Sequence, residues 1–511
     1  MWTILFALFA SVPSALGAAD GEEERAVLLR ILDDERSGDR LRVRWRLRGW
    51  DGVQAYQRVE WQDSTRALFA LHERDAGEAW WDFVSLHYAQ KGRWGEWAIG
   101  DIQPKVAGGL LWGRGRHSSP TARWSLRESR HLGYRSAVEN GVVRGVAWRQ
   151  RAGAWQWLTL AGRAQFDARS DDTGRIVSLP ESGRHVSPVE RRGRDALSAG
   201  VGGLSLRRTI GDSHLGAVLQ FVHFSRRLDL RRRGRTPWDF VGNRQMLWSA
   251  DAALRSSIGE WMGELGCDAD GHCAGLGQWQ LRRGRRYARL LVRYYPAEFR
   301  SFFSAVPSAS TAQNEIGAAL VVGVRGLEAY ADINRRPKRS YFLPVASTHL
   351  AWGGEGRWRV GIGRVRIVLR GVRRPAWADG ALRAEYRLRG YVEAECGQWT
   401  AQSQLVHWRR RGTPVEWGRA LSLRWRMQRR AWRGHIHASA FLSDSFASRL
   451  YEYEYDVPGT VTIRTLYGRG ERVYALVSRR WGRVNIAVRY RLQRDVRWRH
   501  YAGGLVEWTA N

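Results

Sequence analysis

The chain alternates apolar and polar residues with a period of two along most of its length. Residues 41–48 show an apolar set alternating with a cationic set: Leu41, Val43, Trp45 and Leu47 against Arg42, Arg44, Arg46 and Arg48. Successive side chains of a β-strand point to opposite faces, whereas a helix would spread these arginines around its circumference. The pattern therefore predicts a strand with one face in an apolar environment and the other in water.

The same alternation predicts further strands along the whole chain. Early examples, each close to the roughly nine to eleven residues that cross a bilayer, are residues 54–62, 65–74, 83–90 and 94–101. Late examples are residues 382–395, 421–428, 435–442 and 484–491. The polar faces of the late strands are predicted to line a lumen with Arg383, Glu385, Arg387, Arg389, Glu393, Arg424, Arg426, Arg489 and Arg491.

From residue 142 to residue 388, short connections between the predicted strands alternate with longer ones. The short connections are predicted at residues 151–153, 209–213, 257–259, 283–285, 325–326 and 354–356. The longer ones are predicted at residues 164–194, 225–243, 267–273, 296–313, 335–343 and 369–380. Up-and-down outer-membrane barrels sort their connections in this way, and Greek-key sandwiches have no reason to do so. We therefore predict a closed up-and-down antiparallel transmembrane β-barrel of about 22–26 strands over residues 41–508.

The N-terminal residues predict export. Residues 4–10 are apolar, Pro13 interrupts the run, and Ala15-Leu16-Gly17 supplies small residues for cleavage, so residues 1–19 are interpreted as a signal peptide. Residues 20–40 are acidic at their start and predict a periplasmic lead-in that could hold one helix. The last strand, residues 501–508, resembles the terminal strand that the outer-membrane assembly machinery recognises. We expect the outer membrane of a Gram-negative-type bacterium, with lipid and lipopolysaccharide around the barrel.

Positive charge is the main compositional bias: Lys and Arg number 83 and Asp and Glu 50, a net charge of +33. Arginines that line a wet lumen would attract anions, because guanidinium groups match phosphate and carboxylate. Alternatively, they pair with lumen carboxylates such as Glu385 and Glu393, or some of the excess lies in long loops and binds lipid phosphates. A nucleic-acid partner is disfavoured, because Arg and Trp alternate in the strands and so point to opposite faces.

The chain has three cysteines. Cys267 and Cys273 flank a short stretch that contains Asp268, Asp270 and His272. In an exported protein these two cysteines could form a disulfide across a turn. Free thiols and a metal site in the turn are the alternatives.

Glu73, Asp75, Glu78 and Asp101 are acidic residues of the first predicted hairpins in an arginine-rich barrel. They could bind Ca²⁺ or gate a lumen, but paired arginine–carboxylate bridges are the expected arrangement in a narrow interior. The glycine-rich residues 108–115 lack the Lys-Ser/Thr ending and following helix of a phosphate loop. We interpret them as a segment that is kinked or folded inward beside the wall.

Short motifs in chain order resemble a large outer-membrane β-barrel family. They are carried by Glu73, Asp75, Gly77, Glu78, Gly100, Asp101, Gly109, Leu110, Glu139, Arg144, Gly145, His185, Glu190, Asn314, Glu315 and Asp332. Many members of that family carry an N-terminal helix-hairpin-helix module of the competence type. Residues 18–40 lack the Asn-rich turns and Gly-containing hairpin of such a module. The DNA-binding role that the module would imply is therefore not transferred to this chain.

No catalytic arrangement stands out in the sequence. His435, His437 and Ser439 share one strand face, and Ser182, His185 and Glu190 lie in one long connection, but neither group has the context of an activated nucleophile. We predict a monomeric, non-enzymatic pore or transport channel for anionic solutes or polymers, with no cofactor and no metal ion. The alternatives are a barrel component of DNA uptake and a structural or adhesive barrel with a blocked lumen.

Overall fold

The computed structural model describes residues 40–49, 53–113, 117–137, 139–231, 236–309, 311–340, 343–378, 380–457, 461–494 and 498–510. The predicted signal peptide, most of the predicted lead-in and the side chain of Arg48 lie outside the described residues. None of the helices within the described ranges is long and apolar enough to span a bilayer.

Nearly all of the regular structure is β-strand. The barrel strands of the first half are β1 (Arg40–Gly49), β2 (Val53–Gln62), β3 (Arg66–Arg74), β4 (Phe83–Gly92), β5 (Gly95–Ile102), β6 (Val143–Ala152), β7 (Trp155–Phe166), β10 (Leu197–Ile210), β11 (Ser213–Asp229), β12 (Val241–Ser256), β13 (Gly259–Asp268) and β14 (Cys273–Arg283). Those of the second half are β15 (Arg286–Tyr295), β16 (Glu315–Val324), β17 (Leu327–Arg336), β18 (Ser347–Val360), β19 (Gly363–Ala378), β20 (Ala381–Cys396), β21 (Trp399–Arg410), β22 (Glu416–Arg429), β23 (Trp432–Ser443), β26 (Arg469–Trp481), β27 (Val484–Arg494) and β28 (Trp498–Ala510). Four further strands of the described residues are not part of the barrel wall: β8 (Arg169–Ser170), β9 (Ile176–Ser178), β24 (Leu450–Tyr455) and β25 (Val461–Leu466). The helix α4 is Pro188–Gly193.

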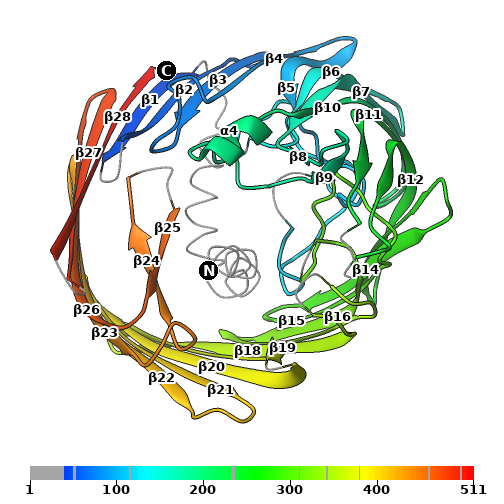
Figure 1. Cartoon of the computed structure of the whole chain (residues 1–511). Coiled ribbons are helices and arrows are strands. Elements are labelled where there is room, and N and C mark those ends of the chain that lie inside the picture. The colour runs from blue at the N-terminus through cyan, green and yellow to red at the C-terminus, as the bar shows by residue number, and fades with distance from the viewer. Residues whose placement is uncertain are drawn as a thin grey trace.

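Within the described ranges, the barrel strands form one closed ring of 24 antiparallel strands. Each strand pairs with the next one along the chain, and β7 pairs with β10 and β23 with β26 across the intervening elements. The ring closes where β1 pairs with β28, with Leu41 opposite Ala510 and Gly49 opposite Ala502. Figure 1 shows this ring along its axis. The predicted fold is confirmed, including the strand number.

The period of two in the sequence becomes an outer and an inner face of the wall. On β1, Trp45 is 57% exposed, whereas the neighbouring Arg44 is 9% exposed. On β22, Leu421 and Leu423 are exposed, whereas Ser422 and Arg424 are buried. Exposed large apolar side chains recur in this way on strands all around the ring. The outside of the barrel is therefore apolar.

Tight turns join the strands at one end of the barrel. Examples are the turns after Ala152, Arg283, Val324 and Trp481. Tryptophan pairs from adjacent strands lie beside these turns, with ring centroids 6.0–6.5 Å apart in Trp148–Trp157, Trp261–Trp279, Trp399–Trp425 and Trp432–Trp481. Aromatic girdles of this kind border the apolar band of outer-membrane barrels.

Two of the predicted connections are wrong. Residues 354–356 lie inside β18, and residues 369–378 lie inside β19, so the turns fall at 360–363 and 378–381 instead. The glycines that suggested a turn serve close packing in the sheet. A Cβ on Gly356 would overlap the Trp358 ring, and one on Gly371 would overlap the Trp352 ring. A glycine that admits a neighbouring ring gives the same sequence pattern as a glycine in a turn.

One side of the barrel interior is filled and apolar. Residues 103–142, between β5 and β6, fold inward and bury Leu110, Leu111 and Trp112. They form one core with inward side chains of the wall and of residues 296–314, such as Leu158, Val218, Leu276 and Phe303. The interpretation that the glycine-rich segment folds inward is therefore correct for residues 108–113. Both faces of the wall can be apolar on this side, because the inserted segment covers the inner face.

The opposite side of the interior holds the hairpin β24–β25, which lies inside the ring (Figure 1). Its strands pair with each other, with Tyr451 opposite Thr465 and Tyr455 opposite Val461. The hairpin contacts β21 and β22 and carries acidic side chains toward β26 and β27. Two inserted elements therefore narrow the lumen from opposite sides.

A disulfide joins Cys267 and Cys273 across the β13–β14 connection, and Cys396 is a free, exposed cysteine. The structure therefore contains the disulfide that the sequence suggested for this turn.

Candidate functional site

The predicted lining arginines with described side chains lie on the inner face of the wall. Arg42 and Arg44 of β1 reach Glu507 of β28, with nitrogen–oxygen distances of 3.6 and 2.6 Å. Arg46 lies over the ring of Tyr56. On the other side of the lumen, Arg424 pairs with Glu393 across β22 and β20, and Arg426 lies 3.3 Å from Glu395. Many of these arginines are therefore paired with carboxylates of the wall.

The hairpin β24–β25 neutralises a second group of arginines. The Glu454 carboxylate, which is fully buried, contacts Arg472 and Arg489, and it lies 3.0 Å from the Nη1 atom of Arg491. Glu452 accepts hydrogen bonds from Arg472 and Ser439 and lies 2.5 Å from Nε2 of His437. The predicted lining residues Arg489 and Arg491 thus hold the hairpin in the lumen.

A third group of arginines, which we call the arginine patch, gathers around Glu385 and the start of the hairpin β24–β25. It comprises Arg374, Arg387, Arg389, Arg410 and Arg449. Glu385 is shared, because its carboxylate lies 2.7 Å from Arg374 and 3.8 Å from Arg410.

The recorded partners of Arg387 and Arg449, among the described residues, are neutral groups. Arg387 donates to the Ala447 carbonyl, and Arg449 donates to the Tyr451 hydroxyl and the Phe446 carbonyl. Arg389 lies over the Tyr451 ring. The arginine patch lies on β19–β21 and the start of the hairpin, toward the long-loop end of the barrel.

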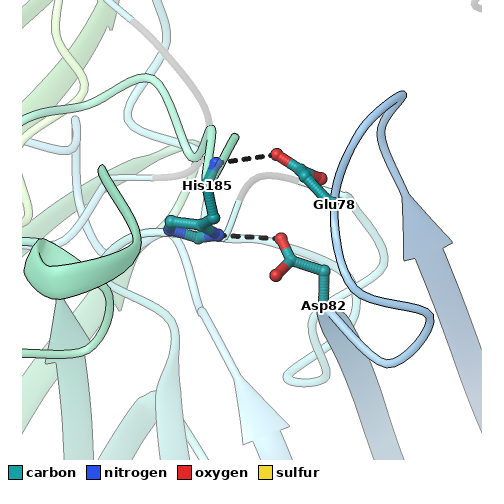
Figure 2. A group of neighbouring side chains, drawn as sticks. All are labelled: Glu78, Asp82 and His185. Carbon is teal, nitrogen blue, oxygen red and sulfur yellow. Dashed lines mark hydrogen bonds and ion pairs between the residues drawn. The ribbon is translucent and has the colours of Figure 1, made fainter. Parts of the chain in front are cut away.

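A cluster of carboxylates around one histidine lies among the long connections (Figure 2). His185, from the β7–β10 connection, has Nδ1 at 2.8 Å from Oδ2 of Asp82 and Nε2 at 3.0 Å from Oδ2 of Asp167. Its backbone N–H donates to Glu78 at 2.8 Å. Glu139 lies 3.6 Å from Nδ1 of His185. We call these five residues the histidine–carboxylate cluster.

Four of the cluster residues are buried and Glu139 is half-buried, and the pKa values of Glu78, Glu139 and His185 are raised. Burial raises the pKa of Glu139 to about 9, and the charges of Asp82, Glu78, Glu73 and Asp167 act in the same direction. Burial also raises the pKa of Glu78. Burial lowers the pKa of His185, but its hydrogen bonds and charge interactions with Asp82 and Asp167 outweigh this and raise it overall. The cluster therefore retains protons that isolated groups would lose.

The cluster also has the composition of a cation site. The ligand atoms of Glu78, Asp82 and His185 lie within 4.8 Å of one another, and all three residues are buried. A second such group in the described part of the chain, Asp268, Asp270 and His272, lies in the exposed disulfide turn.

The arginine–carboxylate bridges expected for the first hairpins are found only in part. Asp101 of β5 pairs with Arg144 of β6 at 2.7 Å, as expected. For Glu78 the expectation is wrong, because its carboxylate accepts from the backbone N–H groups of Asp75 and His185. Asp75 accepts from the Gln54 side chain.

The other motif residues occupy structural positions. Gly100 and Gly145 face each other across β5 and β6, where a Cβ would overlap a neighbouring carbonyl oxygen. Glu190 closes a capping box with Ser187 at the start of α4. Gly77, at a φ of 88°, packs on Val186.

A further set of motif residues surrounds Arg293. The Arg293 guanidinium is fully buried between Glu315 and Asp332. Asn314 bridges to the backbone of Lys338.

Gly109 and Leu110 lie beside Glu264, which accepts hydrogen bonds from the backbone N–H groups of Gly108 and Leu110.

The sequence interpretation missed Asp82 and Asp167 in the cluster, Arg194 beside Asp82, Glu264 beside the inserted segment, and Arg293 between Glu315 and Asp332. Asp82 and Asp167 are isolated acidic residues about 85 positions apart in the chain. No local pattern marks such residues, and only closure of the wall brings them together.

The same structure was compared with known proteins. No protein-family model matches the chain, and no curated protein matches it. Solved structures with a similar barrel include the P pilus usher PapC translocation pore, at 10% identity and a TM-score of 0.36, covering 93% of this chain and 99% of that chain. An E. coli P pilus tip assembly intermediate, PapC-PapD-PapK-PapG, has a TM-score of 0.44 at 10% identity, covering 93% of this chain and 62% of that chain. Pseudomonas aeruginosa OccK8 (OprE) has a TM-score of 0.31 at 8% identity, covering 92% and 97%. At these values no property of those proteins is transferred to this chain, and the motif resemblance stays a prediction.

Proposed function

We propose that this chain is an outer-membrane pore that conducts anionic solutes, acts as a monomer and performs no catalysis. The observation that carries the anion preference is the arginine patch. Among the described residues, Arg374 and Arg410 share the carboxylate of Glu385, whereas the recorded partners of Arg387 and Arg449 are neutral groups. A partly desolvated excess of guanidinium groups attracts anions and repels cations.

The membrane location rests on the outside of the barrel. Soluble monomers rarely expose an apolar patch larger than a few hundred Å². Here the exposed apolar side chains continue around a closed wall that has no sheet edge, which suits a hydrocarbon environment. The tryptophan pairs beside the tight turns would then lie at the membrane surface of that end.

A charge placed in this apolar band should weaken the fold. Leu421→Arg, at an outward position that is 64% exposed, should cost roughly 2–4 kcal/mol if the position lies near the bilayer midplane. Gln402→Arg on the inner face of β21 is the matched control and should cost much less. Urea unfolding in lipid vesicles measures both. Equal effects of the two substitutions would contradict a lipid-facing exterior.

The proposed function is tested by recording from purified protein in planar bilayers under a salt gradient. The reversal potential should indicate a preference for chloride over potassium. Arg387→Gln combined with Arg449→Gln should reduce that preference. Arg373→Gln is the control, because Arg373 is exposed on the neighbouring outward position of β19.

A barrel that folds in the bilayer but passes no current would overturn the proposal. That result would favour a structural or adhesive barrel whose lumen is blocked. Residues 103–142 and the hairpin β24–β25 would be the segments that block it. Cation preference in the unsubstituted protein would also overturn it.

A further inference from the structure

The histidine–carboxylate cluster is unused by the proposed pore and has more buried carboxylates than nearby cations. Glu78, Asp82, Glu139 and Asp167 contribute four carboxyl groups. The recorded cationic side chains beside them in the described ranges are His185, Arg194, whose Nη1 lies 2.8 Å from Oδ1 of Asp82, and Arg74, whose Nε donates to the Glu78 carbonyl oxygen at 3.0 Å. Nδ1 of His185 lies 3.6 Å from Glu139, and the other recorded charge neighbours of Glu139 are acidic: Asp82, Glu78, Glu73 and Asp167.

The orientation of His185 is an independent indication of a ligand. Histidines that bind metal ions commonly donate the N–H of the other ring nitrogen to a carboxylate, which fixes the ring and the tautomer. Nε2 of His185 lies 3.0 Å from Asp167 in this way. Nδ1 then faces Asp82 at 2.8 Å and Glu139 at 3.6 Å. The imidazole is 4% exposed, so its direction is set by the fold.

We propose that Glu78, Asp82, Glu139 and Nδ1 of His185 bind one divalent transition-metal cation such as Zn²⁺. An imidazole nitrogen with carboxylate oxygens suits Zn²⁺ or Mn²⁺, whereas Ca²⁺ and Mg²⁺ prefer oxygen ligands alone. Binding displaces the proton between Nδ1 of His185 and Asp82, and the proton on Glu139, into solvent. Asp167 keeps its hydrogen bond to Nε2 as a positioning residue.

The bound cation ties together three connections at the long-loop end of the barrel. Glu78 and Asp82 belong to the β3–β4 connection, Glu139 to the inserted residues 103–142, and His185 to the β7–β10 connection. Figure 2 shows Glu78 and Asp82 on one side of His185, on a different connection. The site therefore fixes the outer end of the inserted segment to the wall.

Binding should weaken as the pH falls, because protons compete for the ligands. The titratable and charged groups that face the site are Glu73, Glu78 and Asp82 from β3 and its connection, Glu139 from the inserted segment, and Asp167, His185, Arg194 and Asp195 from the β7–β10 connection. Affinity should drop by about tenfold per pH unit for each proton that the cation displaces.

Isothermal titration with ZnCl₂ tests the proposal on full-length, tag-free protein in detergent after treatment with a chelator. A Cys396→Ser background removes the exposed thiol. One Zn²⁺ per chain should bind, excess Ca²⁺ should not displace it, and Co²⁺ should give a visible d–d absorption band at the same stoichiometry. Asp167→Asn should weaken binding by about 10–100-fold while leaving the stoichiometry at one.

Glu139→Gln is the variant that isolates the site, because an amide has the shape of the carboxyl group and the barrel should fold. Heat-modifiable gel migration checks that it does. This variant should lose tight binding, whereas Asp268→Asn with His272→Ala, in the exposed turn, should keep it.

If the folded parent protein binds no Zn²⁺, or if Glu139→Gln binds it as tightly as the parent does, the proposal is wrong. The cluster would then join the connections through shared protons alone. The titration measures Zn²⁺ binding and needs no ion current, so its result does not depend on the result of the bilayer recordings.

Discussion

Glu454→Gln should release the hairpin β24–β25 from the wall and raise the single-channel conductance. The Glu454 carboxylate is fully buried and is shared by Arg472, Arg489 and Arg491, with Arg464 at 3.5 Å. An amide has the shape of the carboxylate without its charge. The substitution therefore leaves several buried guanidinium groups with much less compensation.

Breaking a buried ion pair by removing one partner costs about 3–5 kcal/mol. Part of that free energy is recovered if the hairpin leaves the wall and water reaches the arginines. We therefore expect a larger lumen and a stronger anion preference, since Arg489 and Arg491 would then face water. Bilayer recording measures both, and protease cleavage at the hairpin measures its release.

Glu471→Gln is the matched control, because Glu471 lies on β26 but is exposed on the outward face. It should change neither the conductance nor the cleavage pattern. If Glu454→Gln leaves conductance and cleavage at the parental level, the hairpin is held by its apolar contacts, and the ionic account of its position is wrong.

Glu264→Ala should loosen the inserted residues 103–113 and open the opposite side of the lumen. The Glu264 carboxylate of β13 accepts from the backbone N–H groups of Gly108 at 2.9 Å and Leu110 at 3.2 Å, and from the Ser249 hydroxyl at 3.1 Å. Each donor left unsatisfied in a buried place costs about 1–3 kcal/mol. Gly108 packs against this carboxylate so closely that a Cβ would lie 2.6 Å from its Oε2 atom.

The expected result is a noisier and larger current, together with faster hydrogen exchange of the amides of residues 106–112. Glu260→Ala, on the same strand but beside Gln280 near the tight turn, is the control and should leave both at the parental level. Slow exchange at Gly108 and Leu110 in Glu264→Ala would show that the apolar core around Trp112 holds the segment without the carboxylate.

Some features of this protein follow from the sequence alone. The alternation in residues 41–48 requires Trp45 and Arg44 to point to opposite sides of a sheet, because the pleat has a period of two. The sorted connections require neighbouring strands to run antiparallel in chain order. From these two patterns come the barrel, its approximate strand number and the inner placement of arginines such as Arg424 and Arg491.

Only the tertiary structure determines which arginines have their charge neutralised by a carboxylate and which segments fill the barrel. Nothing near Arg489 in the sequence indicates that Glu454 neutralises it, because the contact depends on a hairpin that folds back into the ring. Likewise, the inward apolar residues of β7 and β11 are compatible with a lumen only because residues 103–142 cover them.

The histidine–carboxylate cluster is the clearest case. Glu78, Glu139 and His185 stand in three separate motifs, and Asp82 and Asp167 in none. Local patterns report only on neighbours along one strand or turn. A contact between three connections is set by the closure and circumference of the barrel, which depend on all the strands at once.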